Sequence, residues 1–96
     1  MGAESFFHKA KGKTAKEAFT NAVEEAAFDY GHGGYSGTIA EKHDFILIPC
    51  PKNENPIKYA EDLVYNNDKR VEDKWGPAGC VKLNGDEYLF FGWASS

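Results

Sequence analysis

The sequence predicts a two-layer α+β domain, in which two main helices pack on one face of a mainly antiparallel sheet of about four or five strands. Three observations predict this class: an alanine-rich amphipathic stretch behind a capping box, a second helix start at Asn55-Pro56, and a hairpin signal at Asn84-Gly85. The elements are expected in the order β-α-β-β-α-β-β. A chain of 96 residues builds one hydrophobic core, so residues 1–96 are expected to form a single domain.

The N-terminal third of the chain predicts a strand followed by a helix. Residues 5–11 alternate in character as the two faces of a strand do. Thr14 and Glu17 have the spacing of a capping box, in which each side chain satisfies the other residue's backbone N–H. Alanines and Phe19 then recur at helical spacing as far as a C-cap at Gly31. This helix is therefore expected to lie close to the sheet, with Phe19 as its main anchor.

The middle of the chain predicts two short strands. Residues 38–41 read as the first of these strands, and residues 42–44 read as a turn. Residues 45–48 are all apolar, which is typical of a strand buried on both faces. The prolines at 49 and 51 cannot donate to a strand ladder, so the second strand is expected to end before them.

A second helix is predicted to begin at Asn55-Pro56, where an Asx N-cap precedes a proline in the first helical position. Two interpretations of its length are open. One helix could continue to Trp75, or the helix could break at Asn66-Asn67, with Asp68 as the cap of a new short helix. We favour the break.

The C-terminal region predicts a β-hairpin formed by residues 78–83 and 86–94. Asn84-Gly85 is the strongest short hairpin signal, because both residues tolerate the positive φ of a type I′ turn. A two-residue loop pairs Leu83 with Asp86, Lys82 with Glu87, Val81 with Tyr88, and Cys80 with Leu89. The pairing of Lys82 with Glu87 is expected to form an ion pair.

Both faces of this hairpin are apolar. In the predicted register one face carries Val81, Tyr88 and Phe90, and the other carries Cys80, Leu89, Phe91 and Trp93. Two short helices are expected to cover one face only, and soluble monomers rarely leave a large apolar patch in water. The sequence therefore predicts a homo-oligomer, in the simplest case a homodimer, with an interface formed by Tyr88, Phe90, Phe91 and Trp93.

Charge and composition exclude several classes of partner. The 11 Lys and Arg residues and 15 Asp and Glu residues give a net charge of -4, which opposes binding to nucleic-acid phosphates. The longest apolar run, residues 45–48, is far shorter than the roughly 20 residues of a membrane span. Two cysteines without a recognisable signal peptide predict an intracellular protein. From the charge and the short apolar run, neither a nucleic acid nor a membrane is expected as a partner.

The motifs of catalysis and metal binding each lack a required feature. The histidines and cysteines do not show the paired spacing of a zinc site; they are His8, His32, His43, Cys50 and Cys80. The glycines from residue 31 follow a helix instead of preceding one, which excludes a dinucleotide fingerprint, and the Walker lysine is missing. The sequence therefore predicts a binding protein and not an enzyme, with no catalytic residue, metal or cofactor.

Four glycines occur within residues 31–37, and ordering so many glycines costs conformational entropy. One interpretation is a binding site, in which bare backbone amides accept an anion while Tyr35 stacks and His32 donates. The predicted site residues are His32, Gly33, Gly34, Tyr35 and Ser36. A phosphate-bearing small molecule, a nucleotide signal or a partner's carboxylate would suit such a site. The other interpretation is a tight crossing between two elements, and both stay open.

Three blocks of the sequence resemble those of a family of small uncharacterised bacteriophage proteins. The blocks are YGHGGYSGTIAEK from residue 30, DKWGPA from residue 73, and FFGWASS from residue 90. The resemblance covers nearly the whole chain and implies a phage accessory protein in the cytoplasm of the infected bacterial host. Such a protein is expected to bind and inhibit a host or anti-phage defence component. The alternative is a homo-oligomeric binder of a phosphate-bearing small molecule through the glycine-rich loop.

Overall fold

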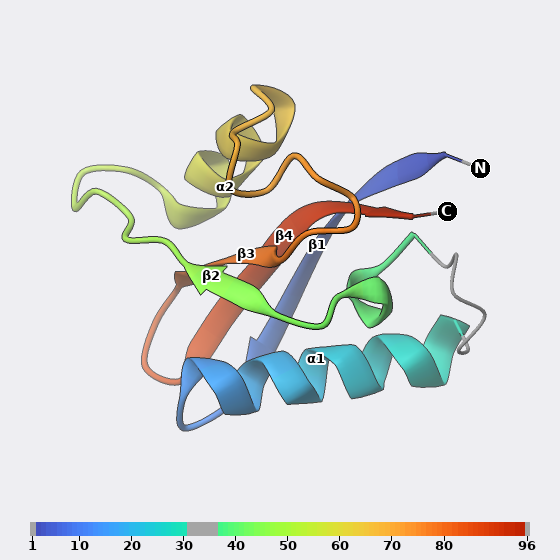
Figure 1. The fold of residues 1–96 in the computed structure, drawn as a ribbon. Coiled ribbons are helices and arrows are strands. Elements are labelled where there is room, and N and C mark those ends of the chain that lie inside the picture. Colours follow the sequence, from blue (N-terminus) through green and yellow to red (C-terminus); the bar gives the residue numbers. More distant parts are fainter. Residues whose placement is uncertain (1, 31–36, 96) are drawn as a thin grey trace.

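A computed structural model describes residues 2–30 and 37–95 of the chain (Figure 1). Its elements are β1 (Ala3–Lys11), α1 (Ala15–Tyr30), the 3-10 turn η1 (Ile39–Glu41), β2 (Phe45–Leu47), α2 (Pro56–Tyr65), β3 (Ala78–Lys82) and β4 (Glu87–Ser95). The predicted α+β class is confirmed, and the order of elements agrees with the prediction except that η1 replaces a strand. Within the described ranges, no helix combines the length and the apolar character of a membrane span.

The four strands form one sheet in the order β1-β4-β3-β2. β1 and β4 are antiparallel over their whole length, from the pair Ala3 and Ser95 to the pair Lys11 and Glu87. β3 and β4 are also antiparallel, whereas β2 runs parallel to β3. A parallel pair needs a crossover connection, and the chain between β2 and β3 supplies one that contains α2. The sheet is therefore mainly antiparallel, as predicted.

The two helices lie on opposite faces of the sheet, with α1 below it and α2 above it in Figure 1. The prediction that both helices share one face, in two layers, is wrong. Side chains along β3 and β4 alternate between the two faces of the sheet, and both faces are apolar. Cys80 and Phe90 point toward α1, while Val81 and Phe91 point toward α2. Each face needs a helix to exclude water, so the chain forms three layers.

The α1 face is packed through small side chains and one aromatic group. Ala18 and Ala22 are completely buried, which allows the helix to approach the strands closely. The Phe19 ring lies 5.1 Å from the Phe45 ring and 5.6 Å from the Phe90 ring, measured between centroids. The prediction that Phe19 anchors an alanine-rich helix on the sheet is confirmed.

The α2 face has a second cluster of buried side chains. Val64 of α2 packs with Val81, Leu89 and Phe91 of the sheet, and all four are buried. Trp93 Nε1 donates to the Val64 carbonyl at 3.4 Å, so the indole joins the last turn of the helix to β4. This contact holds α2 across β4 and β3.

Both helices begin as predicted. The Thr14 hydroxyl accepts from the Glu17 amide at 3.1 Å, and the Asn55 side chain accepts from the Ile57 amide at 2.9 Å. The favoured break after α2 is also confirmed, because the helix ends before Asn67, which has a left-handed φ of 54°. The new short helix expected after Asp68 is wrong, because residues 69–71 form a turn. Local hydrogen bonds and dihedral preferences decide these positions.

The C-terminal hairpin is confirmed, but its register differs from the prediction by one residue. The Leu83 amide donates to the Glu87 carbonyl at 2.9 Å, which leaves a three-residue loop instead of a two-residue one. The observed register pairs Lys82 with Tyr88, Val81 with Leu89, Cys80 with Phe90, and Gly79 with Phe91. Among the described residues Lys82 consequently has no ion pair with Glu87. The shift also exchanges the faces predicted for β3 relative to β4.

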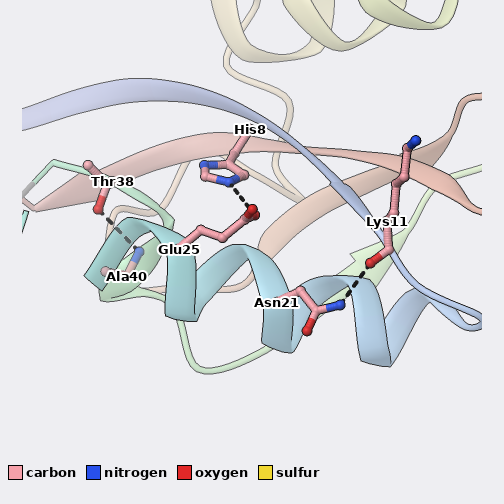
Figure 2. A network of polar contacts seen from close by, with 6 residues as sticks. All are labelled: His8, Lys11, Asn21, Glu25, Thr38 and Ala40. Atoms are coloured by element: carbon pink, nitrogen blue, oxygen red, sulfur yellow. Dashed lines mark hydrogen bonds and ion pairs between the residues drawn. The ribbon is translucent and has the colours of Figure 1, made fainter. Parts of the chain in front are cut away.

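The strand predicted at residues 38–41 is wrong, because these residues form the N-cap and body of η1. The Thr38 hydroxyl accepts from the Ala40 amide at 3.2 Å and caps the turn (Figure 2). Ile39 is fully buried in the α1 face. One helical turn buries a single apolar side chain as well as a short alternating strand does, so the periodicity of four residues cannot distinguish the two. The second predicted strand is shorter than expected and ends at Leu47.

Candidate functional site

The residues predicted to form a glycine-loop site are His32, Gly33, Gly34, Tyr35 and Ser36, and all five lie outside the described residues. Gly37, the last glycine of the block, is described and has a structural role. Its φ is 71°, its amide donates to the Ser95 carbonyl at 2.8 Å, and an added Cβ would lie 2.5 Å from the Glu4 carboxylate. For this position, therefore, the left-handed backbone conformation favours glycine.

The side chains predicted to form a dimer interface are core residues. Phe90 and Phe91 are fully buried, Tyr88 is 7% exposed, and Trp93 is half-buried. The prediction that one hairpin face is left in water is wrong, because α1 covers one face and α2 covers the other. The hairpin therefore supplies no exposed aromatic patch.

The outer edge of β1 is one of the two edges of the sheet, and no strand of the described residues lies beside it. The Gly12 amide donates to the carbonyl of Asp86, the residue directly opposite it. Every second residue from Gly12 toward the N-terminus therefore points its backbone N–H and C=O groups toward β4. Ser5, Phe7 and Lys9 lie between these positions and point their N–H and C=O groups away from the sheet. Among the described residues, no backbone hydrogen bond outside the ladder involves these three.

Two hollows line this edge. The larger, about 480 Å³, lies beside Lys9 and Lys11 and is bounded on the α1 side by Asn21, Glu24 and Glu25. A second, about 280 Å³, is lined by the first half of β1, from Glu4 to His8, and by residues 37–39. Together they follow most of the length of β1, so the edge is accompanied by a groove.

Side chains of α1 reach the strand at two points in this groove (Figure 2). His8 Nε2 lies 3.2 Å from Glu25 Oε1, and Asn21 Nδ2 donates to the Lys11 carbonyl at 2.8 Å. The Asn21 contact occupies the outward carbonyl at the C-terminal end of β1. The outward groups before it, from Ser5 to Lys9, lie along the open part of the groove.

The two sides of the edge differ in chemistry. On the α1 side, Glu24, Glu25 and Asp29 surround Phe28, whose side chain is 90% exposed. On the α2 side, the Phe7 ring lies 6.2 Å from the Tyr65 ring, and both side chains are exposed. One side is therefore acidic around an aromatic ring, and the other carries two aromatic rings and the exposed Lys9.

A second unusual feature is the buried side chain of Lys42, which is 3% exposed. Its ammonium group donates to three backbone carbonyls, those of Asp73 and Lys74 at 3.2 Å and that of Gly76 at 2.9 Å. It also lies 6.0 Å from the centroid of the Phe6 ring. Burial lowers the pKa of Lys42 from 10.5 to about 8, and the nearby Asp73 carboxylate opposes this change. Lys42 thus ties the loop before β3 to the end of η1.

The cysteines have separate and different surroundings. Burial raises the pKa of the Cys80 thiol to about 12, which keeps it protonated and unreactive at neutral pH. Cys50 is partly exposed, and its thiol donates to the carbonyls of Pro51 and Glu54. In the part of the chain that the structure describes, no three His, Cys, Asp or Glu side chains come together as metal ligands.

Comparison with family models, with curated proteins and with solved structures found no match for this chain. The candidate site therefore depends on the geometry alone.

Sequence reasoning missed both the β1 edge and Lys42. For the edge a signal was present: Asn21, Glu25 and Phe28 recur at helical spacing on a side of α1 next to its alanine stripe. For Lys42 no local signal exists, because its three carbonyl partners lie more than 30 residues away in the sequence.

Proposed function

We propose that this chain is a binding protein that inhibits a protein partner by occupying it, as a bacteriophage accessory protein acting on a host or anti-phage defence component would. The proposal is carried by one observation, the unpaired outer edge of β1 with the groove beside it. An unpaired strand edge is a template for a strand from another protein, because each outward N–H and C=O can continue the ladder.

The interior of the protein supports binding at the surface in preference to a buried ligand site. Among the described side chains, every buried nitrogen and oxygen atom has a hydrogen-bond partner. Among the described residues of β1, Ser5, Phe7 and Lys9 have open backbone hydrogen-bonding groups instead. A protein partner that supplies a strand would satisfy these groups.

Inhibition by occupancy requires no chemistry from this chain. A strand-forming segment of the partner that is held along β1 is withdrawn from its own interactions. Under this proposal the protein acts where its partner is, in the cytoplasm of the infected bacterium.

The test is affinity capture from bacterial lysate with tagged wild type and two variants at residue 5. Ser5→Pro removes an outward N–H without removing a bond to β4, and Ser5→Ala retains that N–H as a matched control. We expect wild type and Ser5→Ala to retain the same protein, and Ser5→Pro to lose it. Circular dichroism and thermal unfolding would verify that all three chains are folded.

Two results would contradict the proposal. One is capture of the same protein by all three chains, which would place binding elsewhere. The other is release of an ultraviolet-absorbing small molecule on heating the purified protein, without any dependence of protein capture on residue 5. That second result would favour the phosphate-bearing ligand of the glycine-rich loop.

A further inference from the structure

We propose, on the basis of the function proposed above, that the partner supplies an extended segment in which Lys or Arg alternates with apolar residues. This segment would add to β1 as a fifth strand. Its basic side chains would face α1, and its apolar side chains would face α2. Three observations carry the inference: the backbone groups of the edge, the carboxylates on one side, and the aromatic rings on the other.

The backbone determines the length of the segment. Ser5, Phe7 and Lys9 each offer one outward N–H and one outward C=O. The next outward carbonyl, that of Lys11, already accepts from Asn21 Nδ2 at 2.8 Å. The new ladder would therefore include Ser5, Phe7 and Lys9 and end where Asn21 crosses the strand end.

The α1 side of the edge favours cations. Glu24 and Glu25 line the larger hollow, and with Asp29 they surround the exposed Phe28 ring. The positions of β1 that share this face hold Glu4 and His8 but no lysine. A lysine or arginine here would meet the carboxylates of Glu24 and Glu25 with its charged end.

The α2 side of the edge favours apolar groups. The exposed Phe7 ring belongs to one of the outward-pointing residues, and the Tyr65 ring lies 6.2 Å from it. Because strand side chains alternate, the residues of the added strand that do not face α1 would lie over these rings. The two sides together favour a partner strand whose basic and apolar side chains alternate at every residue.

The same charges disfavour a second copy of this chain as the occupant. In an antiparallel pairing of two β1 edges about a two-fold axis perpendicular to the sheet, both α1 helices lie on the same side. The Glu24 and Glu25 side chains of one copy would then face Glu24 and Glu25 of the other copy across the two paired β1 strands. Like charges at such an interface repel, so a basic partner fits and a second copy does not.

The test uses defined nine-residue peptides with blocked ends: one that alternates Lys and Val, and one that alternates Glu and Val. Binding is followed by titration calorimetry, and hydrogen exchange at the amides of Ser5, Phe7 and Lys9 reports the site. We expect the Lys-Val peptide to bind at least about tenfold more tightly than the Glu-Val peptide. We also expect it to protect these three amides, and to bind more weakly as salt is raised.

A matched pair of variants separates a local effect from a change in net charge. The double variant Glu24→Gln with Glu25→Gln should weaken binding of the Lys-Val peptide roughly fivefold. The control is Glu61→Gln with Asp62→Asn, which removes the same charge from exposed positions on α2. It should leave the affinity unchanged.

Several outcomes would overturn the inference. Equal binding of the two peptides, equal weakening by the two double variants, or absent amide protection would each contradict a basic added strand. A sedimentation mass of two chains, with the three amides protected when no peptide is present, would identify a second copy as the occupant. If the peptides fail while capture from lysate still depends on Ser5→Pro, the partner chemistry is wrong and the proposed function stands. If capture does not depend on Ser5→Pro, the proposed function itself fails.

Discussion

The buried ammonium group of Lys42 makes the stability of this protein depend on pH in a direction that can be measured. Three carbonyls accept from it, but it is almost completely removed from water. Lys42→Met retains the length of the side chain and removes only the titrating group. Comparing wild type with this variant over a range of pH cancels the titration of every other group that the two chains share.

The magnitude follows from the lowered pKa of Lys42, which is 10.5 in the unfolded chain and about 8 in the folded one. Between these values the unfolded chain binds the proton more strongly, so the stability of wild type rises with pH. Below about pH 8 both states are protonated, and the contribution of this titration is constant. The free energy of unfolding of wild type, minus that of Lys42→Met, should therefore increase by roughly 3 kcal/mol between pH 7 and pH 10.5.

The assay is urea unfolding at a series of pH values, followed by tryptophan fluorescence. Lys52→Met is the control, because Lys52 is an exposed lysine in the loop before α2. The free energy of unfolding of wild type, minus that of Lys52→Met, should stay constant over the same pH range. If the difference for Lys42→Met stays constant or decreases between pH 8 and pH 10, the carbonyls stabilise the ammonium at least as much as burial destabilises it, and the reasoning is refuted.

Three further predictions test the packing and the caps. Gly79→Ala should lower the free energy of unfolding by roughly 1–3 kcal/mol, because an added Cβ would lie 2.6 Å from the Phe91 ring; an unchanged urea midpoint would contradict this. Asn55→Ala should cost about 1 kcal/mol, because two amides of the first turn of α2 lose their acceptor, and loss of helical circular dichroism at a lower temperature would show it. In the folded protein Cys50 should react with a thiol reagent at pH 8 and Cys80 should not, because Cys80 is buried with a pKa raised to about 12; equal reaction rates would argue against the packing of β3.

Local signals predicted the ends of the helices correctly. The Thr14 hydroxyl, the Asn55 side chain and the left-handed Asn67 act on backbone groups within a few residues of themselves. Their effect depends on hydrogen bonds and dihedral angles that the neighbouring sequence determines by itself. A pattern of this kind can be read without knowledge of the rest of the fold.

The candidate site could not be predicted in the same way. Whether the edge of β1 is open depends on which strand lies beside it, and the pairing with β4 joins residues from opposite ends of the chain. The carboxylates of Glu24 and Glu25 flank that edge only because α1 packs on the face that contains Phe6 and Ala10. Both facts concern residues that are distant in the sequence.

Capping, turn chemistry and periodicity are local, and they were enough to predict an α+β class with two capped helices and a C-terminal hairpin. The tertiary structure decided the hairpin register, since the three-residue loop places Val81 opposite Leu89 and not opposite Tyr88. It also decided the number of layers, because β3 and β4 are apolar on both faces and only a helix on each face removes both from water. These decisions are the sum of many contacts between distant residues, and no single segment contains the information.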